Sequence, residues 1–452
     1  MRAAALSPAA PPARWAPFAC IALIVGTTLP PATVQAAEEK GLYGPVALKK
    51  HDKPLLYTTT ELEGRFKRRG LRYDDAKYSQ WLTNVARRLF PPSTDSYITY
   101  RIFLFRDPSP NAFALVDGQI YIHTGMLARL QNESQVAGLI AHEINHVAGH
   151  HPIVAARAAR NKATASRVLG GILGNFGWIA QLGIAASMFG YSRALEEEAD
   201  RRAVGLLRDS GYDLAEFPKV FDLLNDDPEG EKPRIQSAWS THPLLAERAA
   251  YLRGMARLAP QEARVRPLIS RSEYSAFVLP ISLMTVEDYI YRDYPRTALS
   301  LAQRLVQQFP NDARVMVAVG DAWLALGARS VLAVDQPLSN EQKEENLRAR
   351  RKLTRAEREA MYRESPEAYK NMKENAQSAK EAYLIALKID ETIPEAHRGL
   401  GEANHDLGMY KDAARAYLRY LKLAPDAPDQ ALVYAELETL LKQINRGMMH
   451  DQ

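Results

Sequence analysis

Residues 138–151 read GLIAHEINHVAGHH and contain two histidines four positions apart. Positions i and i+4 lie on the same face of a helix, so His142 and His146 can present two imidazole nitrogens to one metal ion. The H-E-x-x-H pattern also places Glu143 beside the first histidine, where its carboxylate can act on a metal-bound water without being a ligand. Zinc held by two such histidines needs a third protein ligand and a water. The stretch therefore predicts a helix that carries part of a catalytic zinc site.

Residues 196–200, which read EEEAD, supply the missing parts of that site. Glu196 and Asp200 share one face of a predicted helix, so we expect Glu196 to complete a His₂Glu site for one zinc ion. We expect Asp200 to accept the free ring N–H of a ligating histidine. The adjacent Glu197 and Glu198 have no aspartate four residues later, which favours Glu196 as the ligand. The alternative is an ordinary solvent-exposed acidic start of a helix.

These residues predict zinc-dependent hydrolysis of peptide bonds. Zinc lowers the pKa of its bound water, and Glu143 would take that proton and pass it to the leaving amine. The stretch THPLLAER (241–248) offers His242 and Arg248, either of which could stabilise the developing oxyanion or hold substrate. His242 could instead occupy the open zinc position and keep the enzyme idle. We expect His150 and His151 to lie around the site or at the surface rather than to bind zinc.

The N-terminal segment differs in composition from the rest of the 452 residues, which are 46% hydrophobic and 25% charged. Two arginines precede the apolar run 15–29, and the pattern predicts a cleavable secretory signal peptide over residues 1–36. An uncleaved anchor is the alternative. Cleavage would remove Cys20, the single cysteine, so the metal site must use histidine and carboxylate ligands. The net charge of +5 comes with no concentrated basic stripe, and we expect no nucleic-acid partner.

The hydrophobic pattern predicts a mainly helical chain with a small β-sheet. Residues 55–90 have the period of an amphipathic helix, residues 100–121 alternate like strands with a turn at Asp117-Gly118, and residues 133–150 return to a helical period. Strands followed by an H-E-x-x-H helix are typical of a zincin-type (α+β) metalloprotease domain, which we place at residues 37–265.

Residues 168–192 carry no charge but include six glycines. Their length permits a transmembrane helix, while the glycines and two polar residues argue against one. Contact with a membrane surface and an apolar lid over the cleft are the other interpretations, and the lid is the one we favour.

Beyond residue 265 the pattern is helix after helix. Ala379 and Tyr383 recur 34 residues later as Ala413 and Tyr417, which is the period of a tetratricopeptide repeat. We therefore predict a repeat domain over residues 266–452. A charged insert at about 330–370 interrupts it, and its alternating charges indicate a solvated helix.

The segments NAFALVDGQIYIHTGML, HEINH, EEEAD and THPLLAER resemble, in order and spacing, the zinc metallopeptidase family that includes the CaaX prenyl endopeptidase and HtpX. The similarity is tight over about residues 110–250. It implies that His142, His146 and Glu196 bind zinc, that Glu143 is the base, and that His242 is a candidate switch ligand. It also implies a substrate-pairing strand edge within residues 111–121, at Asn111, Ala112, Phe113 and Ala114.

With a signal ahead and repeats behind, the resemblance extends to periplasmic members of the family. It implies that the substrates are stalled or misassembled outer-membrane β-barrel proteins. The repeat domain would dock against the protease and the outer-membrane barrel-assembly machinery, and would act as a chaperone on productive clients. The alternative function is a non-proteolytic repeat scaffold or chaperone whose zinc site is latent or structural.

Overall fold

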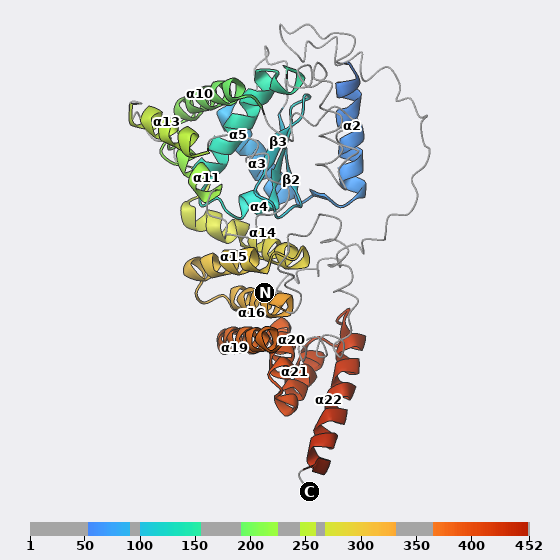
Figure 1. The fold of residues 1–452 in the computed structure, drawn as a ribbon. Helices are drawn as coiled ribbons and strands as arrows, with labels where there is room; N and C mark the ends of the chain where they lie inside the picture. Colours follow the sequence, from blue (N-terminus) through green and yellow to red (C-terminus); the bar gives the residue numbers. More distant parts are fainter. Residues whose placement is uncertain are drawn as a thin grey trace, which may run out of the picture.

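A computed structural model describes residues 53–90, 100–154, 191–224, 245–258, 267–330 and 365–450 of the chain. Its described part is mostly helical with one four-stranded sheet, as the sequence predicts. The sheet domain lies at one end of the molecule, and a stack of helices extends away from it (Figure 1).

The sheet has the strand order β1-β2-β4-β3. Its strands are β1 (Arg72–Tyr73), β2 (Arg101–Phe105), β3 (Ala112–Ala114) and β4 (Gln119–His123). The central pair β2 and β4 is parallel, whereas β3 pairs antiparallel with β4 through the predicted turn at Asp117-Gly118. Gly118 has φ +87°, a conformation that glycine adopts without steric cost. Within the predicted edge region 111–121, only β3 lies at the edge of the sheet, because β4 is paired on both sides.

Alternation along the strands sends side chains to two different cores. Ile102, Leu104 and Ile120 face the main core, with helices α3 (Ala76–Leu89) and α5 (Glu133–Ala148) on that side of the sheet. Phe105, Phe113 and Tyr121 face the other way and pack against helix α2 (Lys53–Arg68), which lies on the opposite side of the sheet (Figure 1). Both faces of strand β3 are therefore covered.

The helical pattern over residues 55–90 is divided in the structure between two elements. Two helices, α2 and α3, are separated by a turn and by the short strand β1. Gly70, at φ +64°, ends the first helix, and the Asp75 carboxylate accepts the backbone N–H of Lys77 to start the second. The amphipathic period continues through the break, so periodicity alone does not reveal it.

Four further helices build the region around the candidate site. A short helix, α4 (Thr124–Leu127), follows β4, and helices α10 (Arg193–Asp209), α11 (Phe217–Leu224) and α13 (Leu245–Leu258) pack around α5. Residues 133–147 of α5 are all buried, so this helix runs through the centre of the domain. Its N-cap is Asn132, whose side chain accepts the backbone N–H of Gln135 at 3.0 Å.

The C-terminal half is a stack of helices in which sequence neighbours pack side by side (Figure 1). The helices are α14 (Arg271–Tyr291), α15 (Pro295–Gln308), α16 (Ala313–Ser330), α19 (Pro366–Ile389), α20 (Pro394–Asp406), α21 (Tyr410–Leu423) and α22 (Gln430–His450). Tyr383 and Tyr417, which are 34 residues apart, are both buried, as expected for equivalent positions of a repeat.

Helix α14 belongs to both halves of the molecule. Tyr274 and Ile281 lie in the core of the sheet domain, whereas Val286 lies in the core of the helical stack. Near its end, Asp288 pairs with Arg106 through two hydrogen bonds of 3.0 and 3.2 Å. The stack is thus fixed directly to the end of strand β2.

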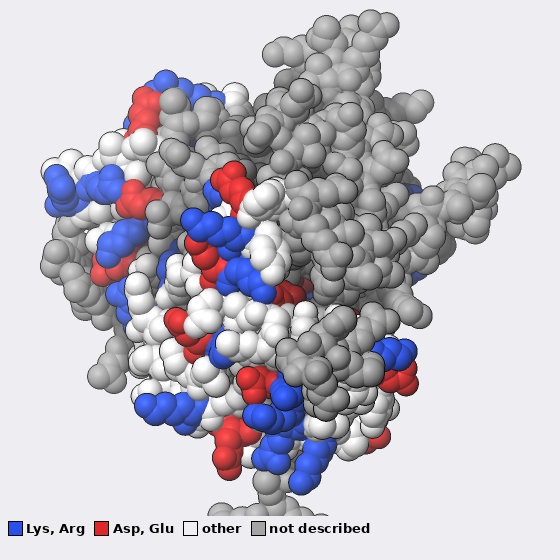
Figure 2. Space-filling view, turned by 60° about the horizontal axis from the view of Figure 1, so that its bottom comes forward, with Lys and Arg blue, Asp and Glu red and all other residues white. Residues whose placement is uncertain are grey.

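Several predictions lie outside the described residues: the signal peptide at 1–36, the apolar segment 168–192 except its last two residues, His242, and most of the charged insert at 330–370. Among the described helices, none combines the length and the hydropathy needed to cross a bilayer. Acidic and basic side chains are interspersed over the described surface in Figure 2.

Candidate metal centre

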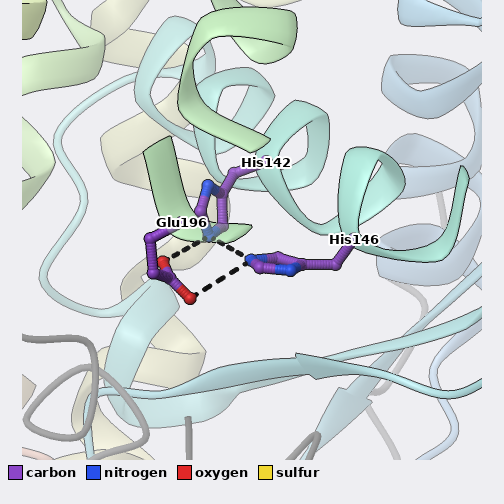
Figure 3. Close-up of side chains that lie close together, drawn as sticks. All are labelled: His142, His146 and Glu196. Atoms are coloured by element: carbon purple, nitrogen blue, oxygen red, sulfur yellow. Dashed lines mark hydrogen bonds and ion pairs between the residues drawn. The ribbon is translucent and has the colours of Figure 1, made fainter. Parts of the chain in front are cut away.

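Helices α5 and α10 bring three potential metal ligands to one point. His142 and His146 project from successive turns of α5, and Glu196 projects from the first turn of α10 (Figure 3). All three side chains are buried, and one ligand atom from each lies within 4.8 Å of the others. The pairing arises because α10 presents one buried face toward α5, made of Glu196, Ala199, Asp200, Ala203 and Leu207.

The distances between the ligand atoms suit an ion of zinc size. The two histidine Nε2 atoms lie 2.9 Å apart, and each lies 3.5 Å from one carboxylate oxygen of Glu196. Tetrahedral ligands at zinc bond lengths are separated by roughly 3.3 Å. Two imidazoles and one carboxylate are also the donor set of a catalytic zinc site that keeps one position open. The residues present therefore fit the metal.

Asp200 holds the other nitrogen of the first histidine. Its Oδ1 lies 2.9 Å from His142 Nδ1, so the ring directs Nε2 toward His146 and Glu196. This is the position in which the sequence analysis expects Asp200. A carboxylate behind a ligating histidine fixes the ring orientation and raises the basicity of the ligand.

A buried arginine from α13 ties the two carboxylates together. Arg248 donates from Nε and Nη2 to both oxygens of Asp200 at 2.8 and 2.7 Å, and its Nη1 lies 2.9 Å from Glu196 Oε2. The guanidinium also lies over the ring of Phe221 at 4.6 Å. Only 3% of Arg248 is exposed, and its guanidinium pairs with two carboxylates. The predicted contact of Arg248 with the oxyanion or with substrate stays a prediction.

Electrostatics in this cluster favour a positive charge between the ligands. Burial alone lowers the pKa of His142, but its hydrogen bonds to Asp200 and Glu196 outweigh burial and raise the pKa to about 9. For Asp200 burial raises the pKa, yet the hydrogen bonds from His142 and Arg248 bring it down to about 2. A divalent cation at the same point would take the place of the proton on His142.

Glu143 has the properties of a residue that exchanges protons near neutral pH. Only 2% of it is exposed, and this burial, together with the negative charge of Glu196, raises the pKa of the carboxyl to about 7 in spite of the opposing effect of His142. General acid–base catalysis is most effective when the pKa lies near the working pH.

The second ligating histidine has different neighbours. His151 Nδ1 lies 2.9 Å from His146 Nδ1, and the ring of Tyr191 stacks on the ring of His146 at 4.0 Å. His151 thus lies beside the ligand cluster, and His150 has a left-handed backbone conformation. Neither residue is among the three clustered side chains, and their expected place outside the ligand set stays a prediction.

The sequence analysis did not identify Tyr191 or Tyr251. The hydroxyl of Tyr251 donates to Asp200 Oδ2, from the same helix as Arg248. The spacing of three residues between Arg248 and Tyr251 places both on one face of α13 and is the signal that could have suggested the contact. No pattern in the sequence indicates that Tyr191 stacks on His146.

The strand expected to pair with substrate packs against the helix that carries His142 and His146. Asn111, Ala112, Phe113 and Ala114 are all buried, and helix α5 packs against β3. Phe113 stacks on Tyr121 with ring centroids 5.1 Å apart, so its side chain points into the aromatic core. The side-chain Oδ1 of Asn111 has no hydrogen-bond partner among the described residues. The outer side of β3 is paired with no other described strand.

Comparison with known proteins identifies the same region. Residues 76–256 match the sequence profile of peptidase family M48, and this segment contains the whole ligand cluster. The beta-barrel assembly-enhancing protease of Escherichia coli K12 is 29% identical over 210 residues, which are 44% of this chain and 42% of that one. The protein of the same name from Yersinia pestis is 27% identical over 215 residues, with the same coverage. Metalloprotease YcaL of Escherichia coli K12 is 30% identical over 189 residues, which are 39% of this chain and 70% of YcaL.

The similarity spans about two fifths of the length of the two assembly-enhancing proteases. It spans more than two thirds of YcaL. The shared part is therefore the domain that carries the metal centre.

Proposed function

The chain belongs to peptidase family M48, and we propose that it is a periplasmic zinc-dependent endopeptidase that degrades misassembled or stalled outer-membrane β-barrel proteins. The observation that carries the proposal is the buried cluster of His142, His146 and Glu196, with Glu143 next to the first ligand. The names of the two assembly-enhancing relatives support the choice of substrate class. The apolar segment at 15–29 supports export.

Each residue of the site has a separate task in this proposal. A bound zinc ion would supply Lewis-acid activation of a water molecule and of the scissile carbonyl. Glu143 would accept the proton of the attacking water and deliver it to the leaving amine, for which a pKa of about 7 is suited. Asp200 would orient His142, and Arg248 would hold Asp200 and Glu196 in place. His242 would contact the reacting carbonyl or close the open metal position.

Substrate would be held by the backbone of β3. Because the side chains of this strand point into the two cores, an extended peptide would pair with its main chain. Main-chain pairing discriminates little between sequences, which suits a protease whose clients share misfolding rather than a sequence motif. The buried Oδ1 of Asn111 would offer one further acceptor at the start of the strand.

The helices after residue 265 would form a tetratricopeptide-repeat domain that recruits partners. The recurrence of Ala379 and Tyr383 at Ala413 and Tyr417 supports the repeat assignment. This domain would dock against the barrel-assembly machinery and would assist productive clients as a chaperone. Contacts between Arg106 and Asp288 would keep it in a fixed position relative to the substrate strand.

Substitution of Glu143 by Gln tests the proposal. The amide keeps the shape but cannot carry the proton, so hydrolysis of an unfolded outer-membrane protein should fall by about 10²–10⁴-fold. Zinc content should be unchanged, because Glu143 is not among the clustered ligands. The matched control is Glu374→Gln on α19, where the side chain is 63% exposed, and this variant should cleave at the wild-type rate.

Full hydrolysis by Glu143→Gln would contradict the proposed mechanism. A variant that cleaves nothing but still restores barrel assembly in cells would favour the scaffold or chaperone function.

A further inference from the structure

A sharp turn ends the helix that carries the two ligating histidines. Helix α5 runs to Ala148, Gly149 caps it, and His150 adopts φ +54°. Residues other than glycine adopt this left-handed region uncommonly, although histidine, asparagine and aspartate adopt it more often than the rest. Backbone strain of this kind is concentrated at functional sites, where the surrounding structure holds it.

The turn brings His151 back against the helix. On a continuous helix a residue five positions later lies about 140° around the axis and could not meet the side chain of His146. Here His151 Nδ1 lies 2.9 Å from His146 Nδ1, and only 1% of His151 is exposed. Gly149 leaves the space for it, because a Cβ at that position would come within 2.4 Å of His151 Nε2.

The chemistry of the ligand assigns the direction of this hydrogen bond. His146 turns Nε2 toward His142 and Glu196, so in its neutral form the ring carries the proton on Nδ1. That N–H donates to His151 Nδ1, which must then accept. The proton of His151 consequently sits on Nε2, which faces Glu198 Oε2 at 3.6 Å.

The two ligating histidines are therefore supported in different ways. A carboxylate, Asp200, accepts from His142. A neutral imidazole accepts from His146, while Tyr191 covers the face of the same ring.

We propose that His151 is a positioning residue that fixes the ring orientation and the tautomer of His146 for metal binding, with Glu198 behind it. This inference rests on the proposed zinc site. It assigns a task to the strained turn at Gly149 and His150, which the peptidase mechanism does not otherwise use.

The test measures the zinc affinity of the full chain by competition with a chromophoric chelator. His151→Leu removes the acceptor and should weaken zinc binding by about 10–100-fold, as found for partners of ligating histidines. His151→Gln keeps an oxygen that can accept from His146 Nδ1 and should recover part of the loss.

Gly149→Ala should weaken zinc binding by displacing His151 without changing the imidazole. The matched control, His150→Asn, tolerates the left-handed conformation and should bind zinc like the wild type.

Circular dichroism verifies that each variant is folded, and Gly149→Ala tests the inference if His151→Leu does not fold. Wild-type affinity in both of these variants would overturn the inference while leaving the zinc site intact. Equal losses of zinc affinity in His151→Leu and His151→Gln would also overturn the inference, because the packing of the imidazole rather than its hydrogen-bond acceptor would then explain the loss. Failure of the wild type itself to bind zinc would remove the proposed function and this inference together.

Discussion

The helices around the metal centre and the helices of the C-terminal stack differ in the kinds of side chain that fill their interfaces. Where α5, α10 and α13 meet, the interior holds charged and polar groups, and His142, Glu196, Asp200 and Arg248 are each at most 3% exposed. Where α16, α19 and α20 meet, the interior is closed by small residues against an aromatic ring, and Tyr383 lies against Gly320 and Gly399.

This difference shows which region is built for stability and which for chemistry. Buried charges contribute little net stability, because desolvation opposes their mutual attraction. Burial of apolar area is the dominant favourable contribution to folding. The concentration of charge at one helix interface therefore requires a functional explanation, and a bound cation provides one. In the stack, the carboxyl of Asp321 accepts a hydrogen bond from the Tyr383 hydroxyl at 2.6 Å, so this acidic group has a protein partner and needs no bound cation.

The largest effect should come from removing the arginine of the metal centre. Arg248→Met leaves Asp200 and Glu196 buried beside each other without their shared cation, and should lower the free energy of unfolding by about 3–5 kcal/mol. Arg398→Met is the matched change in the stack, where the side chain is 37% exposed and pairs with Asp429 at 3.4 Å. It should cost no more than about 1 kcal/mol. Urea denaturation followed by circular dichroism measures both, and equal losses would break the comparison.

A smaller effect is expected from enlarging a glycine in the stack. A Cβ on Gly399 would lie 2.2 Å from the ring of Tyr383, so Gly399→Ala should overpack the interface and destabilise the protein by about 1–3 kcal/mol. Gly254→Ala on α13 is the control, because a Cβ there meets no atom within 4 Å and alanine should stabilise the helix by about 0.5–1 kcal/mol. Thermal unfolding distinguishes the two. If Gly399→Ala raised the midpoint temperature of unfolding, the close packing of Gly399 against the Tyr383 ring would not stabilise the stack.

The smallest effect is a difference in how the two regions respond to pH. Burial raises the pKa of Asp321 in the stack to about 6, so its contribution to stability is present below about pH 4 and is lost as the pH rises through 6. Burial lowers the pKa of His123 in the sheet to about 4, so its contribution is present above about pH 6.5 and is lost as the pH falls toward 4. Lowering the pH from 7 to 5 should therefore strengthen the contribution of Asp321 to the stability of the stack and weaken the contribution of His123 to the stability of the sheet.

Hydrogen exchange of peptides from α16 and β4, corrected for intrinsic rates, measures this difference. Asp321→Asn should abolish the response of the stack and leave that of the sheet. A response of the stack that is unchanged in Asp321→Asn would contradict the assigned pKa shift of Asp321.

The sequence predicts the residues of the candidate site better than it predicts the backbone turns. Both pairs of candidate site residues are recognisable in the sequence because a spacing of four residues within a helix brings His142 to His146 and Glu196 to Asp200 without reference to the rest of the fold. The mainly helical chain with a small sheet was also predicted correctly.

Features that depend on single backbone conformations or on distant contacts were not predictable. The break at Gly70 interrupts an amphipathic pattern that continues on both sides of it, and no motif in the sequence marks the left-handed turn at His150. Tyr251 reaches Asp200 from a helix 51 residues away in the chain, so the contact exists only once the helices have packed.

Metal content tests the central claim most directly. Mass spectrometry of the purified full chain should find about one zinc ion per wild-type molecule. Glu196→Ala should lose it, whereas Glu197→Ala should keep it, because Glu197 is 43% exposed and pairs with Arg201 on the outer face of the same helix. Zinc absent from folded wild-type protein, or retained equally by both variants, would contradict the account.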